Sequence, residues 1–255
     1  MKKAFITIIT LIIVLSVFIS CSNEANEPEM LADGSIVLNK NVTTWKTGTY
    51  VLSSSVVFSD KVRITVEGDV TLILNEGCKL VSYQGITVNK GSKLTINGSG
   101  ELSASNYGDK NDSAIGSRNG KDAGTIVING ATIKAYATYW KGENYGAAIG
   151  GGNHGSCESV IITGGSVKAV GGEYASGIGG GYTRKGANVH IEGGSIDVEA
   201  GALGDPAPSS IGHGGNLLNE DGELYIADGI TMNVSDDGEN WEAYSTSRKR
   251  YMKTF

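Results

Sequence analysis

Short apolar phrases recur in a fixed order between residues 113 and 235. Each unit opens with a small residue, isoleucine and glycine. Two further phrases then carry apolar residues at every second position, which is the period of a strand with one buried face. A strand-like unit repeated every 29 to 34 residues indicates a solenoid. The opening isoleucines are Ile115, Ile149, Ile178 and Ile211, spaced by 34, 29 and 33 residues.

Glycines separate the phrases, as in Asn129-Gly130 and Gly164-Gly165, where the chain must turn a corner. The same order extends upstream to Ile86, which lies 29 residues before Ile115. We therefore predict an all-β fold, a single-stranded parallel, right-handed β-helix solenoid of about six turns with three short strands per turn, capped at both ends. A β-propeller or a sandwich is the alternative, but folds built from hairpins need no recurrent Ala-Ile-Gly phrase.

Stacked turns place like residues on like, so the pattern predicts ladders of aliphatic side chains inside the column. The first ladder contains Ile86, Ile115, Ile149, Ile178 and Ile211, and the second Leu94, Ile126, Val160, Val189 and Leu224. The third contains Ile96, Ile128, Ile162, Ile191 and Ile226. The fourth contains Ile133, Val167, Ile196 and Met232, with Ala135, Ala169, Val198 and Val234 beside it.

The N-terminus has the pattern of a secretory signal peptide over residues 1–20. Lys2 and Lys3 precede an apolar run over residues 4–19, which is short for a membrane span. The ending Phe18-Ile19-Ser20-Cys21 resembles the bacterial lipobox, although that pattern usually has leucine where Phe18 stands. The resemblance implies that Cys21 is lipidated, with fatty acyl chains such as palmitate, and becomes the mature N-terminus. A plain signal peptide cleaved nearby is the alternative.

Residues 21–30 form an acidic, polar stretch that predicts a solvated tether. Acidic residues after a lipidated cysteine resemble a surface-export signal of Bacteroides-like bacteria, so the resemblance implies an outer-membrane or cell-surface location. We expect an N-terminal cap over residues 31–60, the β-helix over 61–235 and a C-terminal cap over 236–255. Cys78 and Cys157 lie about three turns apart, roughly 14 Å along the axis, which is too far for a disulfide.

The corner between the third strand and the next Ala-Ile-Gly phrase is the longest and most variable part of each turn. Its aromatic side chains offer flat apolar faces with polar tips, which suit stacking on a sugar ring. The alternative is that these rings fold back over the end of the core. The candidate ligand-binding residues here are Tyr107, Tyr136, Tyr139, Trp140, Tyr145 and Tyr174.

Lys134 and Lys168 occupy equivalent outward positions of the third strand in adjacent turns. Like charges stacked in this way repel unless something negative lies between them. We therefore add both lysines to the candidate binding residues, with an anionic polysaccharide as the ligand. A solvated face is the alternative, because lysine side chains can splay into water. Nucleic acid is not expected, since a net charge of −6 with scattered charges provides no basic patch.

Metal binding and catalysis have weaker sequence support. The run Asp109-Lys110-Asn111-Asp112-Ser113 could supply oxygens for Ca²⁺, but an EF-hand would need glycine where Ala114 stands. Asp197 and Glu199 point the same way from one strand and could act as a carboxylate pair. Arg118 and Arg184 are candidate bases, but they lie at different offsets in their turns. The sequence favours binding over catalysis and leaves the question of an enzyme open.

The phrases Ala148-Ile149-Gly150-Gly151-Gly152 and Gly164-Gly165-Ser166-Val167-Lys168-Ala169 resemble the repeats of secreted bacterial β-helix proteins described as carbohydrate-binding domains. That family is related in fold to polysaccharide lyases. The resemblance covers roughly residues 60 to 235 and transfers no binding residue. It implies a lipid-anchored surface protein that binds polysaccharide without cutting it. The alternatives are a structural or adhesive protein that binds a protein partner and, less favoured, a lyase or glycoside hydrolase.

Overall fold

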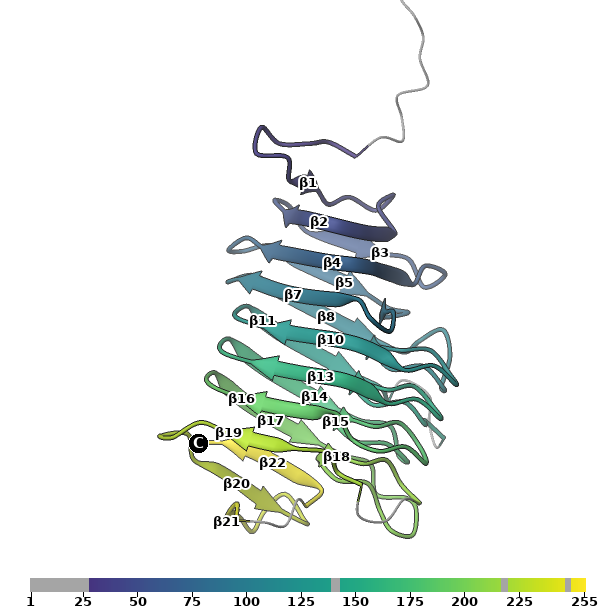
Figure 1. The fold of residues 1–255 in the computed structure, drawn as a ribbon, viewed down its shortest axis with the longest axis vertical. Coiled ribbons are helices and arrows are strands. Elements are labelled where there is room, and N and C mark those ends of the chain that lie inside the picture. The colour runs from purple at the N-terminus through teal and green to yellow at the C-terminus, as the bar shows by residue number, and fades with distance from the viewer. Residues whose placement is uncertain (1–27, 139–142, 217–219, 246–248) are drawn as a thin grey trace, which may run out of the picture.

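Short strands in successive turns stack into parallel ladders around one axis (Figure 1). The computed structural model describes residues 28–138, 143–216, 220–245 and 249–255. The first ladder contains the Ile-Gly strands, and it joins the second ladder in one sheet because the long strand β4 (Ile64–Leu74) pairs with members of both. The Ile-Gly strands are β9 (Ile115–Gly116), β12 (Ile149–Gly150), β15 (Ile178–Gly179) and β18 (Ile211–Gly212), and β6 (Ile86–Val88) precedes them in the ladder with Thr87 in place of the glycine.

The second and third ladders form the other two sides of each turn. The second contains β2 (Thr44–Leu52), β4, β7 (Lys93–Gly98), β10 (Ala123–Ile128), β13 (Cys157–Ile162), β16 (Asn188–Ile191) and β19 (Leu224–Ile226), with β1 (Ile36–Val37) beside β2. The third contains β3 (Val56–Phe58), β5 (Lys79–Ser82), β8 (Glu101–Ser105), β11 (Thr132–Tyr136), β14 (Ser166–Val170) and β17 (Ser195–Glu199). Three further strands continue it, namely β22 (Tyr251–Thr254), β20 (Met232–Ser235) and β21 (Glu242–Ala243).

This architecture confirms the predicted parallel β-helix, and the registers confirm the first three predicted ladders. Ile115 pairs with Ile149, Ile126 with Val160, and Ile128 with Ile162, and the same matches continue through the neighbouring turns. Most of these side chains are fully buried and belong to one continuous core. Because each turn buries its aliphatic residues only against the turns beside it, the core is built from ladders.

The prediction for the end of the fourth ladder was wrong. Ile133, Val167 and Ile196 do stack, but Met232 does not lie directly on Ile196. The C-terminal strand β22 lies between β17 and β20 and pairs antiparallel with both, so Met252 separates Val198 from Val234. An inserted strand of opposite direction satisfies the backbone groups on both edges, which a repeat pattern cannot anticipate.

The first residues of the described chain also take part in the column. β2 pairs in parallel with β4, and β3 pairs in parallel with β5, so the segment over 31–60 adds a turn as well as lying at the end of the column. Trp45, Tyr50 and Phe58 are buried there. Trp45 stacks on Tyr50 at 5.7 Å between ring centroids, and these large rings close the end of the aliphatic core.

The two cysteines within the described ranges are unpaired. Cys157 is buried at the start of β13, where its Sγ donates to the carbonyl oxygen of Gly124 at 3.2 Å. Burial raises the pKa of the Cys157 thiol to about 12, so the thiol stays protonated and packs as a small apolar group. The described residues also contain no helix with the length and apolar character needed to cross a membrane.

The glycine of each Ile-Gly phrase has a conformation that side chains rarely adopt, with φ of 144° at Gly116, 137° at Gly150, 135° at Gly179 and 151° at Gly212. The backbone of the next turn also lies against Gly116, Gly150 and Gly179, whereas the Asp221 side chain lies against Gly212. A Cβ on Gly150 would collide with the carbonyl oxygen of Gly179 in the next turn. The phrase therefore recurs because both the backbone angle and the spacing between turns require glycine.

We expect Gly150→Ala to lower the free energy of unfolding by at least about 2 kcal/mol, from backbone strain plus the collision with the next turn. Urea denaturation measures the change. Gly120→Asn is the matched control: Gly120 also has positive φ, at 69°, but faces open space, and the fifth residue after the isoleucine in later turns is His154, Thr183 or Asn216, all with positive φ. The control should lose less than about 1 kcal/mol. Equal losses in both variants would contradict the contact argument.

Candidate ligand-binding surface

Two sets of corners meet beside the Ile-Gly strands and form a lobe of loops, seen on the right of the column in Figure 1. We call residues 105–122, 143–156 and 171–187 the loop lobe. The Ile-Gly strands are only two residues long, so the corner before each strand lies close to the corner after it. Backbone hydrogen bonds join them: Asn153 donates to the carbonyl of Asn111 at 2.6 Å, and Tyr182 donates to that of Tyr145 at 2.9 Å.

Three tyrosines from this lobe form a continuous aromatic surface, which we call the tyrosine cluster: Tyr145, Tyr174 and Tyr182. Tyr145 stacks on Tyr174 with centroids 5.1 Å apart and an interplanar angle of 18°. Tyr182 lies 5.4 Å from each of them at steeper angles of 57° and 74°. The His154 ring lies 5.9 Å from Tyr182, and the Lys110 ammonium lies 5.7 Å from the Tyr145 centroid. All three tyrosines are half-buried, so part of each ring faces solvent.

Polar contacts hold the loops around the tyrosine cluster. The Asn216 side-chain amide donates to the Tyr182 hydroxyl at 2.8 Å. The Glu173 carboxylate accepts from both the backbone and the side-chain amide of Asn144, each at 2.8 Å. Lys110 forms a 2.7 Å ion pair with Glu143. Since the rings and their supports come from consecutive turns, the geometry of the column fixes the geometry of the cluster.

The other predicted aromatic residues lie in different places. Tyr107 contacts Tyr83 with centroids 6.5 Å apart, and together with Ser59 and Asp60 they line an open hollow of about 380 Å³. Tyr136 lies on β11, half-buried and in register with Ser105 and Val170. Tyr139 and Trp140 lie outside the described residues. The structure thus brings Tyr145 and Tyr174 together and places Tyr107 in a separate hollow.

Lys134 and Lys168 are adjacent in register, as predicted, and each has a carboxylate partner within the chain. Lys134 pairs with Glu101 at 2.8 Å, and Lys168 pairs with Asp197 at 2.6 Å. The hydrogen bond with Glu101 raises the pKa of Lys134, and the bond to Lys134 is the largest cause of the lowered pKa of Glu101. The negative groups that this ladder needs therefore come from the protein itself.

The candidate carboxylate pair is engaged in the same way. Asp197 holds Lys168, and Glu199 pairs with Arg250 at 3.0 Å, which reaches β17 from the C-terminal segment beside β22. Both carboxylates thus form part of the ion pairs that cover the third ladder. Such exposed pairs each contribute roughly 0–1 kcal/mol to stability.

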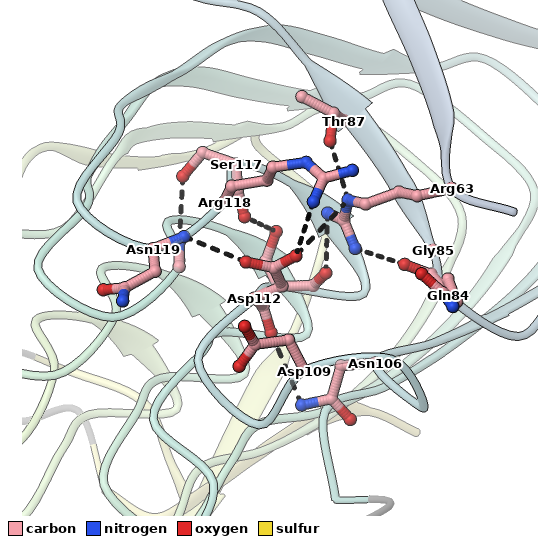
Figure 2. Close-up of polar contacts among 12 residues, drawn as sticks. Arg63, Gln84, Gly85, Thr87, Asn106, Asp109, Asp112, Ser117, Arg118 and Asn119 are labelled. Atoms are coloured by element: carbon pink, nitrogen blue, oxygen red, sulfur yellow. Dashed lines mark hydrogen bonds and ion pairs between the residues drawn. The ribbon is translucent and has the colours of Figure 1, made fainter. Parts of the chain in front are cut away.

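Asp112, a candidate calcium ligand, lies in a buried polar network with Arg63 (Figure 2). Its Oδ2 lies 3.8 Å from Arg63 Nε and 3.9 Å from Arg118 Nη1, while Oδ1 accepts from the Asn119 backbone at 2.9 Å. Asp109 accepts instead from the Asn111 backbone and side chain. The run over 109–113 was expected to bind Ca²⁺. The positive charge beside Asp112 comes instead from the guanidinium groups of Arg63 and Arg118. Within the described ranges, no group of three or more His, Cys, Asp and Glu side chains could hold a metal ion.

Arg63 connects three successive turns. Its Nε donates to Thr87 Oγ1 at 2.7 Å, Nη1 donates to the carbonyl of Gln84, and Nη2 donates to the carbonyl of Ser113 at 3.0 Å. Burial lowers the pKa of Arg63 to about 10, against the opposing attraction of Asp112, so the guanidinium remains charged at neutral pH. This network positions Arg118, whose side chain is 55% exposed at the surface of the lobe.

Sequence reasoning missed Tyr182, Tyr83 and Arg63. Tyr182 lies in the corner after an Ile-Gly strand, whereas the predicted site was restricted to the corner before it. The signal that could have included it is the length of the Ile-Gly phrase, because two residues cannot separate the loops that flank them.

A family model described as beta helix repeat matches residues 126–153 and 160–182. This match supports a β-helix repeat protein, in agreement with the ladders described above. No curated protein and no solved structure matches the chain.

Proposed function

We propose that this β-helix binds polysaccharide through the loop lobe, without cleaving it, and that it is held at a bacterial outer membrane or cell surface by a lipid on Cys21. The observation that carries the binding proposal is the tyrosine cluster, three half-exposed rings gathered from consecutive turns. Tyrosine combines an apolar face with a hydroxyl, which suits a sugar ring with its C–H face and its hydroxyl groups. The supporting hydrogen bonds keep the rings in place before a ligand arrives, which reduces the entropy lost on binding.

The cluster is tested with Tyr174→Ala/Tyr182→Ala against an array of neutral and acidic polysaccharides, with and without Ca²⁺. We expect roughly tenfold to hundredfold weaker binding, because each ring contact contributes about 0.5–1.5 kcal/mol. Tyr174→Phe/Tyr182→Phe should keep most of the affinity because the rings remain. Tyr225→Ala is the matched control, since Tyr225 is 51% exposed on β19 outside the lobe. An equal loss of affinity in the control and in the cluster variant would contradict the assignment of the binding site.

A structural or adhesive role that binds a protein partner is the second candidate, and one observation favours it. Tyr145 and Tyr174 stack face to face, so each ring already covers one face of the other. If the cluster serves only to hold the loops together, the double alanine variant will unfold at a lower temperature while every glycan affinity stays unchanged. A lyase or glycoside hydrolase has less support, because Asp197 and Glu199 are both held in ion pairs.

The lipid anchor is a separate element of the proposal and rests on the sequence, since Cys21 lies outside the described residues. Its test is metabolic labelling with palmitate in a bacterial host. Cys21→Ser should abolish the label and release the protein from the membrane fraction. A label that persists in this variant would overturn the anchor and leave the binding proposal untouched.

A further inference from the structure

The exposed cations of the chain differ in whether a carboxylate lies beside them. Those on the third ladder have carboxylates beside them, as for Lys134, Lys168 and Arg250. In the corners that follow the Ile-Gly strands, Lys121, Arg184 and Lys185 are exposed, and no described carboxylate lies within 4.0 Å of their side-chain nitrogens. These three cations are separated by up to 64 residues in the sequence, but the fold places all of them in corners on the same side of the Ile-Gly strands.

Two adjoining hollows follow these corners along the column. One has a volume of about 500 Å³ and is lined by Arg118 and Lys121, and the other has a volume of about 230 Å³ and is lined by Lys185 and Glu158. Both hollows include Lys90 and Asp122, so they lie side by side. We call the two hollows together the corner groove. Uncharged polar groups complete its lining: Thr65, Thr87, Asn89, Ser117, Ser156 and Asn188.

The corner groove has the opposite charge to the whole protein. Its lining includes the four cations Lys90, Arg118, Lys121 and Lys185 and the two carboxylates Asp122 and Glu158, which gives 4 − 2 = +2, whereas the chain as a whole carries −6. The carboxylates already accept protein donors. Asp122 accepts from the Ser156 backbone and from Lys90, each at 3.1 Å, and Glu158 accepts from the Gly91 backbone at 3.2 Å.

Electrostatics within the groove agree with this arrangement. The pKa of Asp122 is lowered, mainly by the Ser156 backbone hydrogen bond and then by Lys90, with a further contribution from Arg184. Arg184 is held near the groove because its Nε donates to the carbonyl of His154 at 2.9 Å. Arg118 lies 3.9 Å from the Asp112 carboxylate, which also forms an ion pair with Arg63 at 3.8 Å (Figure 2). Several cations are therefore positioned before any ligand is present.

The cations are also spaced along the axis. Lys90 follows β6, Lys121 follows β9, and Lys185 follows β15 two turns further on, at about 4.8 Å per turn. Lys90 and Lys185 thus lie roughly 14 Å apart along the column. A hexose in an extended chain has a length comparable with one turn, so acidic groups on a linear glycan can meet cations from successive turns.

We propose that the corner groove binds an acidic polysaccharide that lies along the column, with uronate carboxylates on Lys121 and Lys185 and sugar hydroxyls on the Ser and Asn side chains. This assignment rests on the proposed polysaccharide function and names its ligand class and a second site. A nucleic acid fits less well, because an excess of two positive charges in a chain of net charge −6 provides little attraction for a polyphosphate.

The test uses the full chain in detergent with polygalacturonate and its fully methyl-esterified form, which differ only in carboxylate charge. Calorimetry should show binding of the free acid that weakens as salt rises and little binding of the ester. Lys121→Ala/Lys185→Ala should bind polygalacturonate about tenfold more weakly. Lys40→Ala/Lys61→Ala removes the same charge from exposed lysines outside the groove and should bind as the wild type does.

Several results would overturn the assignment: equal binding of the ester, equal loss in the Lys40/Lys61 control, or binding of DNA as tight as that of polygalacturonate. Binding of dextran sulfate, which has sulfates and no carboxylates, by a protein that does not bind polygalacturonate would overturn the ligand class. If the wild type binds neutral polysaccharides through the tyrosine cluster but does not bind polygalacturonate, only the proposal for the corner groove is wrong. If the wild type binds no polysaccharide at all, both the corner-groove proposal and the proposed polysaccharide-binding function are wrong.

Discussion

Replacing Arg63 by methionine is expected to lower the free energy of unfolding by about 3–5 kcal/mol. The guanidinium is buried and is held by Thr87, by the carbonyls of Gln84 and Ser113, and by Asp112. Methionine keeps much of the side-chain volume but donates no hydrogen bond. The carbonyls of Gln84 and Ser113 would then lose donors that water cannot easily replace, and the buried Asp112 carboxylate would lose the nearer of its two guanidinium partners.

Urea denaturation of the wild type and Arg63→Met measures this effect. Arg118→Met is the matched control, because Arg118 lies 3.9 Å from the same carboxylate oxygen but has a 55% exposed side chain, and its loss should be below about 1 kcal/mol. In Arg63→Met/Asp112→Ala the carboxylate is absent, so the combined loss should be smaller than the sum of the two single losses. If the free energy of unfolding of Arg63→Met lies within about 1 kcal/mol of the wild-type value, or if the two single losses simply add in the double variant, the network contributes little.

Repetition explains which parts of the fold could be predicted. The aliphatic ladders follow from residues that recur at the same place in every turn, so Ile149 on Ile178 could be placed from spacing alone. The glycine after each isoleucine could be found as a pattern, but its reason lies in contacts between the backbones of successive turns. A sequence repeat therefore predicts where a strand or corner lies, but the physical reason for the glycine at that place comes only from the structure.

The site was only partly predictable, because its residues do not repeat. The position of Tyr182 is occupied by Asn153 in the preceding turn and by Gly215 in the next, so no pattern marks it. Arg63 meets Thr87 and Ser113 across 24 and 50 residues, and neither separation is a whole number of regular turns. The predicted stacking of Val167 on Ile196 already implies that Asp197 lies beside Lys168, whereas Glu101 is in register with Thr132 and reaches Lys134 diagonally.

The C-terminal strand gives the other large effect: Met252→Asp is expected to lower the free energy of unfolding by more than about 3 kcal/mol. Met252 is fully buried between Val198 and Val234, at the point where β22 closes the third ladder. A carboxylate there would either be desolvated without a partner or force β22 out. If β22 leaves, the backbone groups of β17 lose their partners and the apolar ladder behind them meets water.

Thermal unfolding together with size-exclusion chromatography measures both consequences, since a freed β17 edge promotes association between copies of the chain. Lys253→Gln is the control on the same strand. Lys253 points outward, with its ammonium 4.0 Å from the Trp241 ring centroid, and its replacement should lose less than about 1 kcal/mol. If Met252→Asp unfolds like the control and stays monomeric, β22 is a peripheral addition. If it unfolds early and associates, β22 is the strand that covers the parallel ladder at β17, because an open β-ladder must be covered to remain soluble.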